Sequence, residues 1–132
     1  MDLKWTPAMS TGIRQIDLQH QDLIEIINEL EREHLAGEVA RALDEVLPRL
    51  SAYVLFHFGT EETLLSGVPG AVQHLEKHAG EHREFAAEVA ALVALRDAPG
   101  ATVDLAPLVA YLKRWLVDHI MHTDRELGAL LA

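Results

Sequence analysis

Residues 53–65 decide the fold, and they read Tyr53-Val54-Leu55-Phe56-His57-Phe58-Gly59-Thr60-Glu61-Glu62-Thr63-Leu64-Leu65. His57 and Glu61 are four residues apart, so on a helix they project from the same face, one turn apart. The rest of that face is apolar at steps of three and four residues, which is typical of a helix in a bundle; its members are Val39, Leu43, Val46, Leu50, Tyr53 and Leu64. A buried carboxylate is costly unless a cation neutralises it. The segment therefore predicts a metal ion held by a histidine and a carboxylate.

The chain has 132 residues, a net charge of -10 and no cysteine. Its length suits one domain, in which we expect an irregular arm over residues 1–17 and a helical bundle over residues 18–132. The negative charge argues against nucleic acid or an anionic membrane as a partner. Without cysteine there is no disulfide, thiolate metal site or iron–sulfur cluster. We see no secretory leader and no apolar run of the ~20 residues that span a membrane, and we expect a cytoplasmic protein.

Periodic apolar segments predict an all-α fold with four helices, over about residues 18–36, 38–66, 71–96 and 105–131. Asp17 and Asp104 are candidate N-caps, because their carboxylates can accept hydrogen bonds from the first free backbone N–H groups. Pro48 lies inside the second helix and predicts a kink or a short break, whereas Pro107 falls in a first turn, where proline costs least. Short connections between successive helices imply an up-down-up-down antiparallel four-helix bundle.

Candidate metal ligands from all four helices lie at one end of this bundle. The start of the first helix, the end of the second, the start of the third and the end of the fourth meet there. At a rise of ~1.5 Å per residue, the side chains within a few turns of one level are His20, His57, Glu61, His78, His82, His119 and Asp124. His34 lies at the opposite end of its helix, so we expect it at the surface. Scattered core histidines would have no reason to share one depth, so we predict a metal site.

The spacing leaves two choices open. On the third helix, His74 is four residues from His78 and could replace His82, although His74 only flanks the apolar face. On the fourth helix, Asp124 lies five residues after the first histidine, about 140° around an ideal helix, and His122 is better spaced. A local widening of the helix, or a carboxylate that reaches round, would bring Asp124 into the site.

With these motifs the sequence resembles the hemerythrin family, in particular its single-domain bacterial members. The resemblance covers nearly the whole chain. It rests on Trp5, Gly12-Ile13, Ile16-Asp17-Leu18-Gln19-His20, His57-Phe58-Gly59-Thr60-Glu61-Glu62, His78-Ala79-Gly80-Glu81-His82, Phe85 and Trp115-Leu116-Val117-Asp118-His119-Ile120-Met121-His122-Thr123-Asp124. The family's spacing of a histidine and an aspartate five residues later selects Asp124 over His122, and the family pattern likewise selects His82 over His74.

The resemblance implies a non-haem di-iron centre with five imidazoles, two bridging carboxylates and an oxo or hydroxo bridge. By position, the ligands would be His78, His82 and His119 on one iron, His20 and His57 on the other, and Glu61 and Asp124 as bridges. Counting these ligands gives six around the first iron and five around the second. The second iron would keep an open position for O2 or a similar small ligand.

The implied function is reversible O2 binding, for transport, storage or delivery. We do not expect an enzyme, although weak peroxidase-type activity would be compatible with the site. A dry pocket would protect the bound ligand, and by position it would be lined by Leu23, Phe58, Trp115 and Ile120. The alternatives are a di-iron enzyme that handles peroxide or nitric oxide, and an oxygen or redox sensor module.

The ligand types favour binding over oxidation. Ferritin-like di-iron sites use four carboxylates and two Glu-x-x-His motifs. One such motif occurs here, from Glu31 to His34, and it lies at the wrong end of the bundle. Fewer anionic ligands should stabilise high-valent iron less. The chain departs from the family pattern at Val68-Pro69 and Leu127, and it carries two extra histidines near the site, His74 and His122, which we expect to be solvated.

Overall fold

The computed structural model describes residues 3–96 and 106–131. Within these ranges the chain is all-α, with helices joined by turns and no strand. The long elements are α1 (Arg14–Leu35), α3 (Leu47–Ser66), α4 (Val72–Arg96) and α5 (Ala106–Asp118), and α5 continues through a π-helical turn, η3 (His119–Asp124), into α6 (Arg125–Leu131). The short elements are a 3-10 turn, η1 (Pro7–Met9), then α2 (Val39–Arg41) and a second π-helical turn, η2 (Ala42–Val46).

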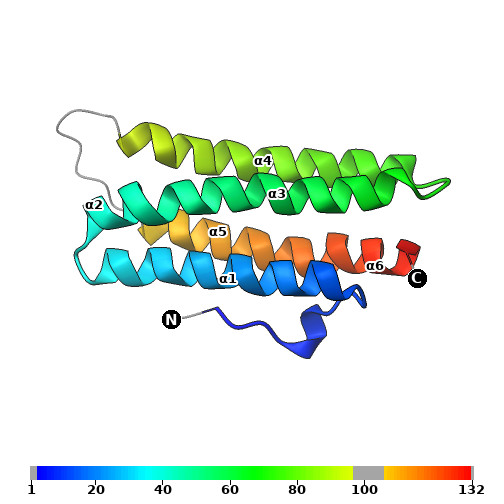
Figure 1. Cartoon of the computed structure of the whole chain (residues 1–132), viewed down its shortest axis with the longest axis horizontal. Helices are drawn as coiled ribbons and strands as arrows, with labels where there is room; N and C mark the ends of the chain where they lie inside the picture. The colour runs from blue at the N-terminus through cyan, green and yellow to red at the C-terminus, as the bar shows by residue number, and fades with distance from the viewer. Residues whose placement is uncertain (1–2, 97–105, 132) are drawn as a thin grey trace.

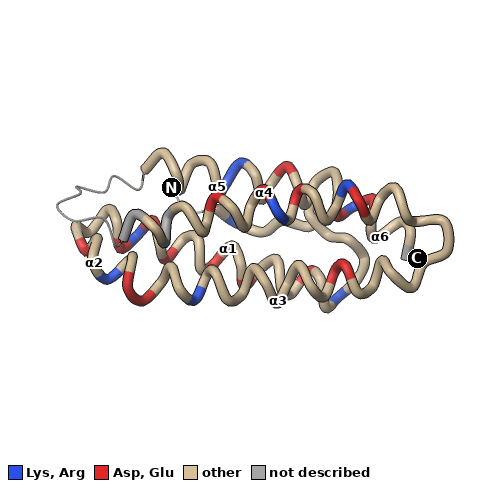
Figure 2. The backbone as a smooth tube through the Cα atoms, turned by 90° about the horizontal axis from the view of Figure 1, so that it is seen from above, with Lys and Arg blue, Asp and Glu red and all other residues tan. Residues whose placement is uncertain are grey.

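The long helices run antiparallel in succession, as Figure 1 shows, so the predicted up-down-up-down bundle is confirmed. α3 packs against both α1 and α4, and α1 packs against α5. The start of α1, the turn between α3 and α4, and α6 all lie at one end of the molecule (Figure 1). Acidic positions are spread along α1, α3 and α4 (Figure 2), whereas α5 carries one, Asp118. In the described part, each helix is too short or too polar to cross a lipid bilayer.

The core is a column of apolar side chains between the helices, and its members include Leu23, Ile27, Leu30, Leu50, Phe85 and Leu112. On α3 the buried face differs slightly from the prediction. Val54 and Leu65 are buried, whereas the predicted Tyr53 and Leu64 are only partly buried. The Tyr53 hydroxyl donates a hydrogen bond to Asp22 Oδ2 at 2.9 Å. A phenol needs such a partner, which keeps Tyr53 at the edge of the core.

The start of α1 corrects the predicted role of Asp17. α1 begins at Arg14 instead of Leu18, and its N-cap residue, Ile13, makes no side-chain capping bond. The Asp17 carboxylate instead accepts hydrogen bonds from the backbone N–H and the hydroxyl of Thr11, both at 2.8 Å, and from the Ser10 hydroxyl at 2.8 Å. Asp17 was therefore wrongly predicted as a cap. It holds the N-terminal arm against the first turn of the bundle.

The proline in the second predicted helix distorts the helix without ending it. Pro48 is the second residue of α3, and the π-helical turn η2 directly precedes that helix. Proline lacks an N–H group and crowds the carbonyl four residues earlier, so a wider turn before it relieves both problems. Pro107 is the second residue of α5, as predicted. The predicted cap at Asp104 and the connection between the third and fourth predicted helices lie outside the described residues.

Candidate metal centre

The seven predicted ligand side chains are buried together at the end of the bundle that contains α6. They come from α1, α3, α4 and η3, and their exposed fractions range from 0% to 3% for His20, His57, Glu61, His78, His82, His119 and Asp124. The other three histidines belong to neither ligand group, although the His74 ring centroid lies 5.6 Å from that of His78. His122 is exposed, as expected, and His34 is partly buried. The expectation that His74 is solvated is wrong, because only 11% of its side chain is exposed. His74 Nδ1 instead lies 3.3 Å from Glu126 Oε2.

Within the cluster, the side chains form two groups that share both carboxylates. One group joins Glu61 and Asp124 to His78, His82 and His119, and the other joins the same carboxylates to His20 and His57. In each group, one ligand atom from every member lies within 4.8 Å of all the others. Both groups therefore have donor atoms close enough to surround a metal ion.

The carboxylate of Asp124 lies between the two groups. Its Oδ1 is 2.6 Å from His78 Nε2 and 3.0 Å from His119 Nε2, whereas its Oδ2 is 2.8 Å from His20 Nε2. Each oxygen thus faces histidines of a different group. This is the position that a carboxylate needs to bind one metal ion through each oxygen.

Glu61 lies between the groups in a less symmetric way. Its Oε1 is 3.1 Å from His57 Nε2 and 3.3 Å from His82 Nε2. Its Oε2 is 3.7 Å from His20 Nε2 and 3.8 Å from His78 Nε2. Because each oxygen approaches one histidine of each group, Glu61 can also contact two neighbouring cations.

The π-helical turn η3 explains how Asp124 reaches the cluster. Its hydrogen bonds span five residues instead of four, so residues five apart come onto the same side. His119 and Asp124 are the first and last residues of this turn, and both are buried. His122, which the spacing of an ideal helix favoured, is turned outward and exposed. Of the two possible ways to bring Asp124 into the site, the structure therefore shows the local widening of the helix.

The cluster also contains buried polar atoms that lack partners. Both oxygens of Glu61, Oδ2 of Asp124 and Nε2 of His20 and His57 make no hydrogen bond within the described residues. The short distances among these atoms therefore do not correspond to hydrogen bonds. Unpaired buried polar atoms cost free energy, and a cation in their midst would remove that cost. Five imidazole nitrogens and two carboxylates are a donor set that suits Fe, Mn or Zn ions.

The pKa values of the cluster indicate the same need for positive charge. Burial lowers the pKa of His57 to about 3, so this imidazole is neutral and able to bind a metal. Burial, and then the charge of Asp124, raise the pKa of Glu61 well above its ordinary value. Burial alone would lower the pKa of His20, but the carboxylates of Asp124 and Glu61 outweigh it and raise the pKa to about 9. In this cluster a proton supplies positive charge where a metal ion could supply it instead.

Further polar side chains fix the orientation of the histidine rings. His57 Nδ1 lies 2.7 Å from Oε1 of the buried Gln19, and His119 Nδ1 lies 3.1 Å from Glu81 Oε1. The Thr123 hydroxyl donates to the same Glu81 carboxylate. Partners of this kind orient metal-binding histidines and raise their basicity. The sequence alone assigns no role to Gln19 and Glu81, although each directly precedes a predicted ligand.

Aromatic side chains stack on two of the histidines. The Phe58 ring stacks on His82 with a centroid distance of 3.7 Å and an interplanar angle of 3°. Trp115 stacks on His119 at 4.6 Å and 12°. Leu23 and Ile120 are fully buried in the same core as Phe58, whereas Trp115 is partly buried. All four predicted pocket residues therefore lie in or against the apolar core, and the two aromatic ones touch the cluster.

Comparisons with known proteins agree with this arrangement. The family model described as Hemerythrin HHE cation binding domain matches residues 11–131. A bacteriohemerythrin of Pseudomonas aeruginosa is 35% identical over 122 residues, which cover 92% of this chain and 76% of the relative. A bacteriohemerythrin of Stenotrophomonas maltophilia is 31% identical over 93% of this chain and 77% of the relative. A hemerythrin-like protein of Naegleria gruberi is 27% identical, with 96% and 92% covered. No solved structure gave a significant match.

Proposed function

Because the chain belongs to the hemerythrin HHE cation-binding domain family, we propose that its buried cluster holds two iron ions and that the protein binds O2 reversibly. His78, His82 and His119 would hold one iron, His20 and His57 would hold the other, and Glu61 and Asp124 would bind both. A solvent-derived oxo or hydroxo group would complete the centre. When bound, the iron pair supplies the electrons and the coordination position that O2 binding requires.

The observation that carries this proposal is the division of the cluster into two groups that share both carboxylates. The groups differ by one imidazole, so the ion held by His20 and His57 has one protein ligand fewer. A metal site with an open position can take a small ligand, whereas a closed site is structural. The asymmetry of the histidines thus supports a ligand-binding site on one side of the cluster.

The chain's own residues have two tasks in this function. The imidazoles and carboxylates hold the metal ions in a buried, fixed arrangement, and Gln19 and Glu81 orient two of the rings. Leu23, Phe58, Trp115 and Ile120 exclude water, because solvent and protons would promote loss of the bound O2 and leave oxidised iron. The cluster has only two carboxylates, which favours reversible binding over substrate oxidation. Transport, storage and delivery of O2 are all compatible roles.

Cycling between O2 and an O2-free atmosphere tests the proposal. The iron-loaded, reduced protein should contain two iron ions per chain, develop a new absorption spectrum with O2, and return to its starting spectrum when O2 is removed. The control is the same protein loaded with zinc, which has no accessible redox change and should give no spectrum. One metal ion per chain would contradict the assignment. Irreversible oxidation with catalytic consumption of peroxide would favour a di-iron enzyme instead.

A further inference from the structure

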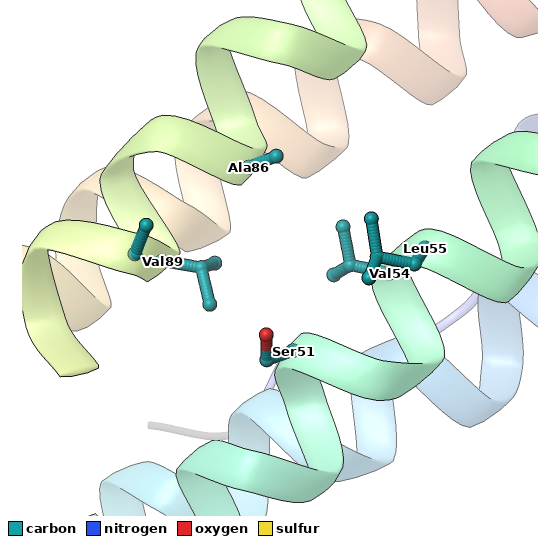
Figure 3. A pocket seen from close by; sticks show the side chains of 6 residues that line it. Ser51, Val54, Leu55, Ala86 and Val89 are labelled. Carbon is teal, nitrogen blue, oxygen red and sulfur yellow. The ribbon is translucent and has the colours of Figure 1, made fainter.

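The facing sides of α3 and α4 carry several small residues, and the two helices leave a cleft between them. Ser51 and Gly59 on α3, with Ala79 and Ala86 on α4, are among the residues that line it. The cleft consists of two adjoining pockets with volumes of about 210 Å³ and about 180 Å³, which share Leu55 and Ala86. Figure 3 shows the first pocket, with Ser51 and Leu55 on one wall and Ala86 on the other.

The inner end of this cleft reaches the metal cluster. The second pocket is lined by Phe58 and His82, whose rings are stacked. The Phe58 ring centroid also lies 5.7 Å from that of His57 and 6.3 Å from that of His119. Phe58 therefore contacts histidines of both groups of the cluster. Its ring thus both lines the cleft and touches the cluster.

The lining of the cleft selects for small apolar molecules. The first pocket is walled mainly by aliphatic side chains such as Val54, Leu55 and Val89. The charged residues of the second pocket, Glu62 and Arg83, are partly or fully exposed to solvent and so lie at its mouth. Ordered water needs several polar partners, whereas apolar cavities bind apolar guests such as xenon. Ions would lose their hydration without compensation.

We propose that the cleft between α3 and α4 takes up O2 from solvent and delivers it past the Phe58 ring to the metal cluster. This inference rests on the proposed function, since it names the entry route to that site. Phe58 is held by stacking and packing and has no polar group to anchor it, so on this proposal a change of its side-chain rotamer opens the way from the cleft to the cluster. The aliphatic walls concentrate O2 beside the ring.

Gly59 allows the cleft to be filled without disturbing the helix. A Cβ atom built at Gly59 meets no other atom within 4 Å, and this helical glycine has an ordinary φ. Gly59→Leu therefore places a side chain in the second pocket and also raises helix propensity. The matched control is Ala52→Leu, because Ala52 is exposed on the same helix and does not line the cleft.

Two measurements test the route. Crystals under xenon pressure should show xenon in the cleft of the wild type and of Ala52→Leu, and none in the second pocket of Gly59→Leu. In stopped-flow experiments on the reduced, iron-loaded protein, Gly59→Leu should lower the O2 association and dissociation rates by the same factor, about ten. The equilibrium affinity should not change, because a route alters rates without altering either end state.

The outcomes separate this inference from the function on which it rests. Absence of xenon from the wild-type cleft, or an unchanged O2 association rate in Gly59→Leu, would overturn the entry route while O2 binding itself stands. A wild-type protein that takes up two iron ions but gives no reversible O2 spectrum would overturn the proposed function, whatever xenon does. A fall in affinity without a fall in association rate would show that Gly59→Leu perturbs the metal site, and it would also count against the route.

Discussion

Oε1 of Glu81 lies 3.1 Å from Nδ1 of His119, and the Thr123 hydroxyl donates to both oxygens of the same carboxylate at 2.8 and 2.9 Å. On the other side of the cluster, the partner of His57 is the neutral amide of Gln19. The two groups of ligands thus differ in the charge behind one imidazole. A carboxylate makes its imidazole the more basic metal ligand, because it stabilises the positive charge that develops on the ring.

Replacing Glu81 by glutamine should therefore weaken metal binding without removing a ligand. Glu81→Gln keeps a hydrogen-bond acceptor but loses the negative charge, and the loss of such a partner lowers metal affinity about 10–100-fold. Competition with a coloured chelator for Fe(II) under anaerobic conditions measures this affinity. Glu76→Gln is the control, since Glu76 is exposed on the same helix. Equal affinities for the two variants would show that Glu81 does not support His119.

Removing a histidine should affect iron binding only when that histidine belongs to the cluster. His57→Ala removes one of only two imidazoles in its group, so the protein should lose about half of its iron, and the O2 spectrum should vanish with it. Metal analysis of the purified protein and the absorption spectrum under O2 measure the two effects. His34→Ala is the matched control, because His34 lies outside the cluster. Two iron ions retained in His57→Ala would contradict the assignment of this residue.

Apolar periodicity predicts the bundle, and the level of each residue along its helix predicts that candidate ligands from all four helices meet at one end. The choice of His82 over His74 and of Asp124 over His122 is settled only by the family resemblance. Periodicity does not predict which side of the fourth helix faces inward at Asp124. The region around η3 contains neither proline nor glycine, so only the five-residue spacing from His119 hints at a π-helical turn. The role of Asp17 was also hidden, since its partners in the arm, Ser10 and Thr11, have no periodicity of their own.

Trp115 should protect the cluster from solvent. Its ring stacks on His119 and it is partly buried, so it lies between this ligand and the surface. Trp115→Leu should leave the iron content unchanged but speed conversion of the O2-loaded protein to the ferric form, because water gains access. It should cost about 1–2 kcal/mol of unfolding free energy, less than the ~3–5 kcal/mol of removing a buried tryptophan. The decay of the O2 spectrum in air measures the rate of conversion to the ferric form. Decay of the Trp115→Leu spectrum at the wild-type rate would exclude a protective role.

Gly128 should be essential for docking of the N-terminal arm. A Cβ atom built at Gly128 would lie 2.0 Å from the Thr11 backbone oxygen, so any side chain must displace the arm. Gly128→Ala should lower the unfolding free energy by about 1–3 kcal/mol, as other overpacking substitutions do, and speed proteolysis of the arm. Gly59→Ala is the control and should be stabilising by about 0.5–1 kcal/mol, because it has free space and lies in a helix. Similar stabilities would argue against the close approach at Gly128.

The ion pair between Glu31 and Lys113 should give the metal-free protein a pH-dependent stability. The two groups lie 2.6 Å apart, with side chains 18% and 17% exposed, and the hydrogen bond from Lys113 lowers the pKa of Glu31. A carboxyl group with a lowered folded-state pKa contributes stability above its ordinary pKa of 4.5 and loses it as the pH falls toward the lowered value. Lys113→Met should therefore cost about 1 kcal/mol at pH 7 and progressively less below pH ~4.5. Urea unfolding of the wild type and of Lys113→Met, at pH 7 and again below pH ~4.5, measures this cost at each pH. Lys77→Met removes the exposed pair of Lys77 with Glu126, whose charged atoms lie 3.7 Å apart, and should cost almost no unfolding free energy at either pH. A cost for Lys113→Met that does not change with pH would show that the ion pair with Glu31 is not its source.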